Sequence, residues 1–272
     1  MRRHLTKATD YKKVKNTLNE GKLHTICESG LCPNKGECWN AGTATFMILG
    51  DICTRSCRFC NVKTGKPFPP DPLEMDRVAE AVKKMGVKHC VITSVDRDDL
   101  PDGGASYWAG TIKAIKRIAP GTTVEALIPD FKGREKDIQT VINSAPEVIS
   151  HNLETVRSLT KEVRVYADYD TSLDVIRYIA RNSNIRTKSG IMLGLGETEE
   201  DILQTMDDLL DAGCEVITIG QYLQPSSKHL PVKKYIHPDD FSRYGGIARS
   251  KGFAFVESAP LVRSSYHAEK HV

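Results

Sequence analysis

The sequence predicts an α/β fold built from parallel βαβ units. Short apolar, β-rich runs recur at 45–49, 89–93, 123–128, 147–150, 189–193 and 215–219. Stretches with helical periodicity lie between them, at 72–85, 107–118, 135–143, 172–181 and 198–212. Because strands and helices alternate in strict order, we expect right-handed crossovers and a parallel sheet. Periodicity alone does not decide between a full or partial barrel and an open, doubly wound sheet.

The order of these elements divides the chain into three parts. Residues 1–43 precede the first predicted strand and form an N-terminal extension. Residues 44–252 form the repeating βα body, and residues 253–272 form a C-terminal extension that follows a last β-like run. In a barrel or an open sheet, the loops after the strands form the working face. Residues directly after each predicted strand are therefore the first candidates for chemistry.

Length and composition fit an ordinary soluble globular protein. The 272 residues are 40% hydrophobic and 27% charged, and 38 Lys and Arg face 35 Asp and Glu, for a net charge of +3. Such a balance does not favour nucleic acid or an anionic membrane as a partner. No apolar run approaches the length of a membrane span of about 18 residues, and the segment Met1-Arg2-Arg3-His4 lacks the apolar region of a signal peptide. We therefore expect a cytoplasmic protein.

The cysteine distribution favours metal binding over disulfides. Six of the eight cysteines lie between Cys27 and Cys60. Cys90 and Cys214 lie far downstream inside apolar runs, where we expect small buried side chains.

Cys53, Cys57 and Cys60 have the spacing CxxxCxxC and follow the first predicted strand. A structural zinc site needs four ligands, whereas a 4Fe-4S cluster held by three thiolates leaves one iron open. With Phe59 beside the last cysteine, this motif resembles the radical S-adenosylmethionine superfamily. The resemblance implies that the open iron binds the amino and carboxylate groups of S-adenosylmethionine. It also implies reductive cleavage to a 5′-deoxyadenosyl radical, so that the cofactor carries the difficult chemistry.

A second trio, CxxxxCxxxxxC, is formed by Cys27, Cys32 and Cys38. This spacing alone is also compatible with a structural zinc site or with the remnant of a disulfide. The segment 27–39 and the later run Arg263-Ser264-Ser265-Tyr266 resemble the lipoyl synthase family. That resemblance implies an auxiliary 4Fe-4S cluster on the trio, with Ser265 as its fourth ligand. Serine oxygen is a hard ligand among soft thiolates, so its bond to iron is expected to exchange most easily.

The same resemblance extends over about residues 24–268 and implies a partial (β/α)6 barrel. Its further segments are 50–52, 93–100, 151–155, 188–197 and 220–225, each at the C-terminal end of a predicted strand. The segment Gly194-Leu195-Gly196 is too short for a dinucleotide motif and predicts a tight turn. The candidate contacts to the ribose or amino group of the cofactor are Asn152 and Glu154. The candidate partner of its carboxylate is Arg164. Further candidate cofactor contacts are Thr93, Ser94 and Met192.

The implied activity is insertion of two sulfur atoms, at C6 and C8 of an octanoyl group carried on a protein lysine, with the auxiliary cluster as sulfur source. The implied cofactors are two 4Fe-4S clusters and S-adenosylmethionine. The implied partners are octanoylated lipoyl domains of 2-oxoacid dehydrogenases or the glycine cleavage H protein, an electron donor and a cluster-repair protein. We expect a largely apolar tunnel for the octanoyl chain.

Two alternatives remain. A radical sulfur-inserting enzyme of the biotin synthase type would share Cys53, Cys57 and Cys60, but the second trio and the run 263–266 argue against it. A zinc-stabilised nucleic-acid-binding module would use both trios as scaffolds. Near-neutral charge, 7% aromatic residues and regular βα alternation argue against that module.

Overall fold

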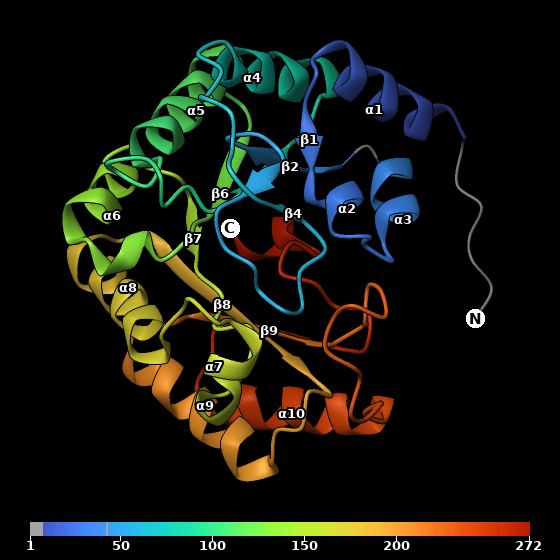
Figure 1. Cartoon of the computed structure of the whole chain (residues 1–272), viewed down its shortest axis with the longest axis vertical. Helices are drawn as coiled ribbons and strands as arrows, with labels where there is room; N and C mark the ends of the chain where they lie inside the picture. Colours follow the sequence, from blue (N-terminus) through green and yellow to red (C-terminus); the bar gives the residue numbers. More distant parts are fainter. Residues whose placement is uncertain (1–7, 42) are drawn as a thin grey trace.

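A curved, largely parallel sheet forms the centre of the molecule in the computed structural model, which describes residues 8–41 and 43–272 (Figure 1). The strand order is β1-β2-β5-β6-β7-β8-β9-β10, with β1 antiparallel to β2 and every other neighbouring pair parallel. Because β1 and β10 are the two edges of the sheet, the barrel is partial. The strands are β1 (His24–Thr25), β2 (Thr45–Ile48), β5 (His89–Ser94), β6 (Thr123–Leu127), β7 (Val148–Ser150), β8 (Arg186–Leu193), β9 (Val216–Gln221) and β10 (Phe255–Ser258).

Helices surround the sheet on its outer side (Figure 1). All six predicted strands and all five predicted helices are confirmed. Local signals set the helix ends. A capping box between Thr198 and Asp201 starts α9 (Glu199–Asp211), and Gly86, whose φ of 69° is left-handed, caps the end of α4 (Glu74–Met85). The helices of the repeating units are α4 (Glu74–Met85), α5 (Ala105–Ile118), α6 (Glu135–Ile142), α7 (Thr160–Val163), α8 (Tyr169–Asn182), α9 (Glu199–Asp211) and α10 (Pro238–Lys251), with short 3-10 turns at Phe131–Gly133 and Arg157–Leu159.

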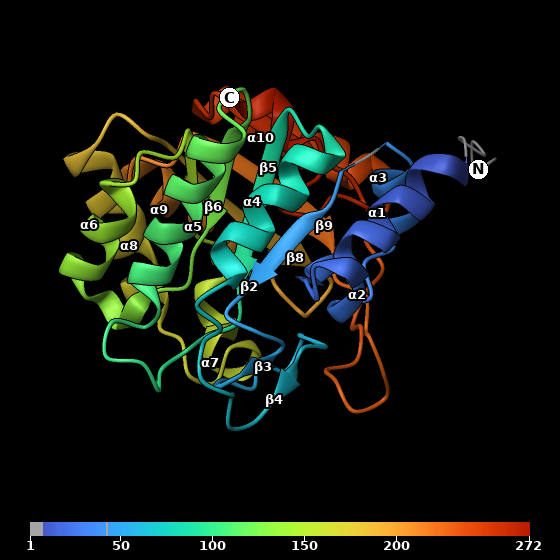
Figure 2. The same ribbon diagram turned by 90° about the horizontal axis from the view of Figure 1, so that it is seen from above.

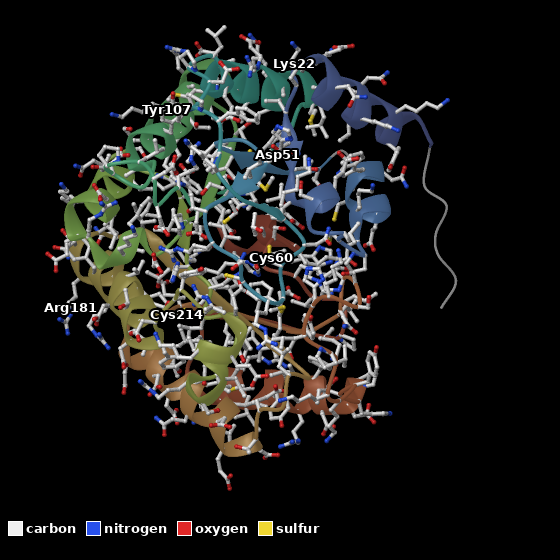
Figure 3. All side chains as sticks on the ribbon, in the orientation of Figure 1. Lys22, Asp51, Cys60, Tyr107, Arg181 and Cys214 are labelled. Carbon is white, nitrogen blue, oxygen red and sulfur yellow. The ribbon has the colours of Figure 1, made fainter. Side chains whose placement is uncertain are left out.

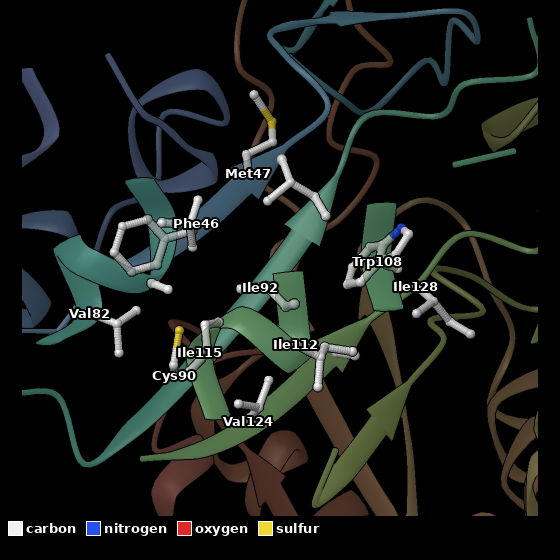
Figure 4. Close-up of a cluster of buried hydrophobic side chains, with 14 of the residues drawn as sticks. Phe46, Met47, Val82, Cys90, Ile92, Trp108, Ile112, Ile115, Val124 and Ile128 are labelled. Atoms are coloured by element: carbon white, nitrogen blue, oxygen red, sulfur yellow. The ribbon is translucent and has the colours of Figure 1, made fainter. Parts of the chain in front are cut away.

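The main core lies between these helices and the outer face of the sheet. Trp108, Ile112 and Ile115 of α5 are fully buried beside Ile92 of β5 and Val124 of β6 (Figure 4). Each such side chain contributes about 1.5–3 kcal/mol to the free energy of folding through removal of apolar surface from water. Cys90 and Cys214 are 0% and 2% exposed, which confirms the prediction of small buried residues.

The inner face of the barrel carries a buried ion pair. Val124 packs outward, so its neighbour Glu125 points inward. The Lys188 ammonium lies 2.9 Å from the Glu125 carboxylate, and the Ser150 hydroxyl donates to the same carboxylate at 2.7 Å. Both charged side chains are fully buried, so each compensates the other where water is excluded.

The N-terminal segment is more helical than the sequence suggested. It forms α1 (Ala8–Glu20), α2 (Ile26–Ser29) and α3 (Lys35–Asn40). Val14 and Leu18 of α1 are buried, and Tyr11 packs on Trp39 of α3 with ring centroids 5.0 Å apart. Only one narrow stripe of α1 is apolar, which is why its pattern was weak. No helix in residues 8–41 or 43–272 is long and apolar enough to cross a bilayer.

The segment after β10 crosses back toward the N-terminal helices and ends in a 3-10 turn at Ala268–His271. Asn34 donates a hydrogen bond of 2.7 Å to the Leu261 carbonyl, and Tyr266 approaches Glu37 at 3.4 Å. The sheet includes β1 and β10, so it extends into both the N-terminal segment 1–43 and the C-terminal segment 253–272. The two extensions meet at the open side of the barrel.

Candidate functional site

The first cysteine trio lies on the loop that follows β2, at the C-terminal end of the barrel strands (Figure 2). Cys53 belongs to the short strand β3 (Ile52–Cys53), which pairs with β4 (Lys63–Thr64). Cys57 and Cys60 occupy the turn between these strands, and Cys60 lies near the centre of the view in Figure 3. All three line one cavity of about 540 Å³. The expected placement on the working face is therefore confirmed.

Burial raises the pKa values of these thiols. Together with the nearby carboxylate of Asp96, it brings the pKa to about 11 for Cys53, about 12 for Cys57 and about 11 for Cys60. The backbone amides of Arg55 and Asp96 point at Cys53 Sγ from 3.4 and 3.3 Å. Uncomplexed thiols here keep their protons, so a bound metal must displace them. The two amides then stabilise a sulfur that carries negative charge.

Arg55 fixes this loop to the barrel. Its guanidinium donates to both oxygens of Asp98 at 2.7 and 2.9 Å, and to both oxygens of Asp130 at 2.7 Å each. A third carboxylate, that of Asp96, lies 3.6 Å from Arg55 Nε. Asp98 follows β5 and Asp130 follows β6, so one buried side chain joins three loops. Arg55 was not among the predicted site residues, although it lies inside the CxxxCxxC motif.

The second trio belongs to the N-terminal helices. Cys27 lies in α2, Cys38 in α3 and Cys32 between them. Cys27 and Cys32 line the same cavity as the first trio, whereas Cys38 is half-buried beside it. Burial, together with the neighbouring Cys27 and Cys32, raises the pKa of Cys38 to about 12. The first trio and two cysteines of the second therefore face one cavity, although the second trio lies outside the six predicted strands.

The two serines of the C-terminal segment contact different partners. Ser265 accepts a hydrogen bond of 2.9 Å from the Thr45 hydroxyl on β2. Ser264 accepts one of 2.7 Å from the Asn152 side-chain amide. Ser265 therefore lies beside Thr45, which also contacts Cys27 of the second trio, whereas Ser264 contacts a predicted cofactor residue. Arg263 also lines the cavity and lies near Cys32 and Glu154.

The predicted cofactor contacts gather in the same cavity. Glu154 has a left-handed φ of 66°, which is uncommon outside glycine and is held by backbone hydrogen bonds to Gly190 and Met192 on β8. Burial raises the pKa of Glu154, whereas Arg164 and a hydrogen bond of 3.1 Å from Asn152 favour its charged form. Residues of the prediction that line the cavity are Thr93, Ser94, Asn152, Glu154, Arg164 and Met192.

Arg164 is held by its own surroundings before any ligand binds. It is 7% exposed, and its Nη1 donates to the Leu153 carbonyl at 3.2 Å and to Ser172 Oγ at 3.1 Å. This support orients a guanidinium whose remaining donors suit a carboxylate.

His151 is a cavity residue that sequence reasoning passed over as part of a longer motif. Its Nδ1 lies 2.9 Å from the Ile128 carbonyl, and its Nε2 is buried with no partner in the described part of the chain. Burial, together with the positive charge of Arg164, lowers the pKa of His151 to about 4, so the ring is neutral at pH 7. The Nδ1 contact identifies Nε2 as the free acceptor.

The turn Gly194-Leu195-Gly196 is confirmed as a tight turn. Gly194 and Gly196 have left-handed φ values of 104° and 116°. The amides of all three residues donate to the carboxylate of Glu197. The chain's own carboxylate therefore fills the anion site that a dinucleotide phosphate would need.

All eight cysteines are free thiols. In residues 8–41 and 43–272, no three or more His, Cys, Asp or Glu side chains converge on one ion position. A structural zinc ion needs four ligands within about 2.0–2.3 Å of one centre, whereas the ligands of an iron–sulfur cluster bind separate irons.

The cavity lining is largely apolar, in agreement with the expected tunnel, but it also carries charged groups. Asp96, Glu154, Arg164 and Arg263 contribute charged groups, while Leu31, Val62, Ile191, Tyr222 and Leu223 contribute apolar surface. A ligand with both a zwitterionic and an apolar portion suits such a mixed lining.

Comparison with known proteins places these observations in a family. The model of the radical SAM superfamily matches residues 47–209. Lipoyl synthase of Christiangramia forsetii is 59% identical over 262 residues, covering 96% of this chain and 89% of that protein. Lipoyl synthase of Parabacteroides distasonis is 60% identical, covering 96% and 93%. The mitochondrial lipoyl synthase of Nematostella vectensis is 57% identical, covering 100% and 94%.

Solved structures share the fold at much lower sequence identity. The hydrogenase maturase HydG from Carboxydothermus hydrogenoformans aligns with a TM-score of 0.62 at 13% identity, over 97% of this chain and 77% of that one. SuiB from Streptococcus suis, bound to S-adenosylmethionine, aligns with a TM-score of 0.61 at 12% identity, over 92% and 62%. These alignments support the partial barrel.

Proposed function

Because this chain belongs to the lipoyl synthase family of the radical SAM superfamily, we propose specific roles for its cavity residues in inserting sulfur into a protein-bound octanoyl chain. The enzyme is a sulfurtransferase that uses S-adenosylmethionine and 4Fe-4S clusters. The observation that carries the assignment of roles is that the first trio, together with Cys27 and Cys32 of the second, lines one cavity with Asn152, Glu154 and Arg164. A cofactor held by the first trio and a sulfur source held by the second would then reach the same substrate.

The first trio suits a cluster with one open iron. Cys53, Cys57 and Cys60 supply three thiols, and they open into a cavity large enough for a small molecule. Arg55 holds their loop in place through Asp98 and Asp130. Glu154 and Asn152 would bind the amino group or the ribose of S-adenosylmethionine, and Arg164 would bind its carboxylate. Thr93, Ser94 and Met192 would line the rest of that site.

The second trio suits an auxiliary cluster whose fourth ligand is Ser265. Thr45 lies between the two: it donates to Ser265, and its hydrogen bonds oppose the rise in the Cys27 pKa that burial causes. When bound, the first cluster and S-adenosylmethionine supply one-electron reduction and hydrogen abstraction, and the auxiliary cluster supplies sulfur. The protein's own contribution is to orient these groups and to exclude water from the cavity.

The substrate is a protein-bound octanoyl group. We assign its carrier to lipoyl domains of 2-oxoacid dehydrogenases or to the glycine cleavage H protein. An electron donor and a cluster-repair protein complete the proposed set of partners, and the cytoplasm is the proposed compartment. The proposed boundaries remain 1–43, 44–252 and 253–272.

An anaerobic assay tests these assignments. Reconstituted protein, a reductant, S-adenosylmethionine and an octanoyl-lysyl peptide should yield 5′-deoxyadenosine and a peptide whose mass has risen through sulfur insertion. About eight irons with matching sulfide per chain are expected for two 4Fe-4S clusters. One cluster per chain, with sulfur insertion intact, would contradict the role of the second trio.

A further inference from the structure

Two loops at the cavity mouth carry only positive charge. Residues 52–70, around the first trio, contain four Lys and Arg residues and no Asp or Glu. Residues 222–237, after β9, contain three lysines and again no acidic residue. Because the whole chain has 38 basic and 35 acidic residues, the rest of the molecule carries a net negative charge. The basic excess of the protein is therefore concentrated in these loops.

The two loops form one surface. The Leu230 amide donates to the Arg58 carbonyl at 3.1 Å, and His229 Nε2 lies 3.1 Å from the Cys60 carbonyl. Phe59 packs against an apolar cluster that includes Tyr222 and Leu230. Both loops project to the same side of the barrel, the side on which β3 and β4 lie (Figure 2). Their charges therefore act together on anything that approaches the cavity.

Most acidic residues near this face are already engaged. Asp98 and Asp130 bind Arg55, Asp99 binds Arg97, and Glu197 accepts from its own turn. Lys63 lies 2.9 Å from Asp51, and Lys233 lies 3.9 Å from Glu162. Four exposed cations remain with no carboxylate within 4.0 Å in the described part of the chain, and we call them the basic rim: Arg58, Lys66, Lys228 and Lys234.

Exposed apolar side chains lie among these charges. Phe68 is 78% exposed and Tyr235 is 73% exposed, each within two residues of a basic-rim lysine. Leu31 and Leu223 are exposed and also line the cavity. Large apolar side chains on a surface, ringed by charges of one sign, are typical of a protein-binding site.

We propose that the basic rim is the docking surface for the protein that carries the acyl-lysine, and that this carrier presents an acidic surface around its modified lysine. The proposal rests on the proposed function, because it takes the octanoyl chain as the group that enters the cavity. Complementary charge steers the carrier to the mouth and disfavours basic proteins that display other acylated lysines. Phe68 and Tyr235 then supply apolar contact area beside the entrance.

Peptides test the charge preference directly. Three fluorescently labelled octanoyl-lysyl peptides of equal length would be compared, with flanks of Glu and Asp, of Gln and Asn, or of Lys and Arg. Each would be titrated with the cluster-loaded protein, and binding would be followed by fluorescence anisotropy. The acidic peptide is expected to bind roughly tenfold more tightly than the neutral one at about 0.05 M salt, and the difference should disappear near 1 M salt, where the screening length is about 3 Å. Equal affinity for all three peptides would overturn the proposal.

Charge reversal at the basic rim localises the effect. Lys228→Glu with Lys234→Glu should remove the preference for acidic flanks, whereas Lys136→Glu with Lys113→Glu, on the exposed faces of α6 and α5, should leave it intact. If both pairs of substitutions changed the preference for acidic flanks equally, the basic rim would be excluded as the docking surface. If an oligonucleotide displaced the labelled acidic peptide at a lower concentration than the unlabelled peptide does, the surface would be assigned to nucleic acid. Sulfur insertion into saturating neutral peptide tests the proposed function separately, because it does not depend on the rim.

Discussion

The hydroxyl groups of Thr45 and Ser265 meet at 2.9 Å, which joins β2 to a segment 220 residues later in the chain. Thr45 is buried, and it also contacts Cys27 of the second trio. The next serine, Ser264, instead accepts from Asn152 in the cofactor group. Two adjacent serines thus connect one tail to both halves of the cavity. Replacing Ser264 should therefore have a different consequence from replacing Ser265.

Replacing Cys53, Cys57 or Cys60 with Ala should abolish reductive cleavage of S-adenosylmethionine. Each change removes one of three thiolates, and the cluster has no spare ligand in this loop. Anaerobic measurement of 5′-deoxyadenosine checks the expectation, with Cys90→Ala as the control because Cys90 is buried in the core and away from the cavity. Unchanged 5′-deoxyadenosine formation in any of the three variants would remove the assignment of this trio.

Arg164→Lys should weaken binding of S-adenosylmethionine by about tenfold, or about 1.4 kcal/mol, although the charge is retained. An ammonium cannot reproduce a bidentate contact to a carboxylate. Ser172→Ala removes one support of Arg164 without changing any charge, and a smaller loss is expected. Isothermal titration of the cluster-loaded variants gives the dissociation constants. An unaltered constant for Arg164→Lys would refute the proposed contact.

Arg55→Met should lower the free energy of unfolding of the metal-free protein by roughly 3–5 kcal/mol, because it leaves buried carboxylates without their partner. Arg157→Met is the matched control. Arg157 also holds a carboxylate with two short contacts, to Asp170, but that pair is exposed and should be worth about 1 kcal/mol or less. Denaturant unfolding measures both. Equal losses for the two variants would show that Arg55 does not hold the loop.

Strand and helix positions could be predicted because they depend on local periodicity. The first trio could be predicted for the same reason, since three cysteines within eight residues define their own spacing. The partners of Arg55 could not be predicted from the sequence, because Asp98 and Asp130 come from two other loops and contact Arg55 only in the folded barrel. Helix α1 was missed because Tyr11, Val14 and Leu18 are its few apolar residues on an otherwise polar helix.

The C-terminal segment shows the same division between local and distant information. The run 263–266 resembles a family motif, and that resemblance alone singled out Ser265. Nothing in two neighbouring serines indicates that one contacts Thr45 and the other Asn152. That distinction depends on the path of the chain after β10, which is fixed by contacts such as the one from Asn34 to Leu261.

Stability should fall in acid through the buried pair of Glu125 and Lys188. Burial alone raises the pKa of Glu125, but the Lys188 ammonium, the His89 ring 3.8 Å away and a hydrogen bond from Ser150 hold it at about 2, below its ordinary 4.5. The pair's contribution is therefore complete above about pH 4.5 and is lost as the pH falls toward 2. Glu125→Gln should cost roughly 3–5 kcal/mol at pH 7 and flatten this acid-side dependence. Unfolding curves from pH 2 to 7 test it, and an unchanged slope would contradict the assignment.

The second trio should separate radical formation from sulfur insertion. Cys27→Ala, Cys32→Ala and Cys38→Ala should leave the first cluster and 5′-deoxyadenosine formation intact while eliminating the sulfur-containing product. Ser265→Ala should be milder, because three thiolates remain and water can take the fourth position, yet turnover should fall. Iron content, measured first, distinguishes lost chemistry from misfolding.

Ser264→Ala should differ from Ser265→Ala in kind. It removes the acceptor of the Asn152 amide, so it should weaken binding of S-adenosylmethionine and leave the iron content of the auxiliary cluster unchanged. The neutral control is Ser242→Ala, an exposed serine on α10. Product mass and 5′-deoxyadenosine are measured together for each variant. The assignment of the auxiliary cluster requires the Cys32 thiolate as a ligand. Normal sulfur insertion by the Cys32→Ala protein would therefore contradict it.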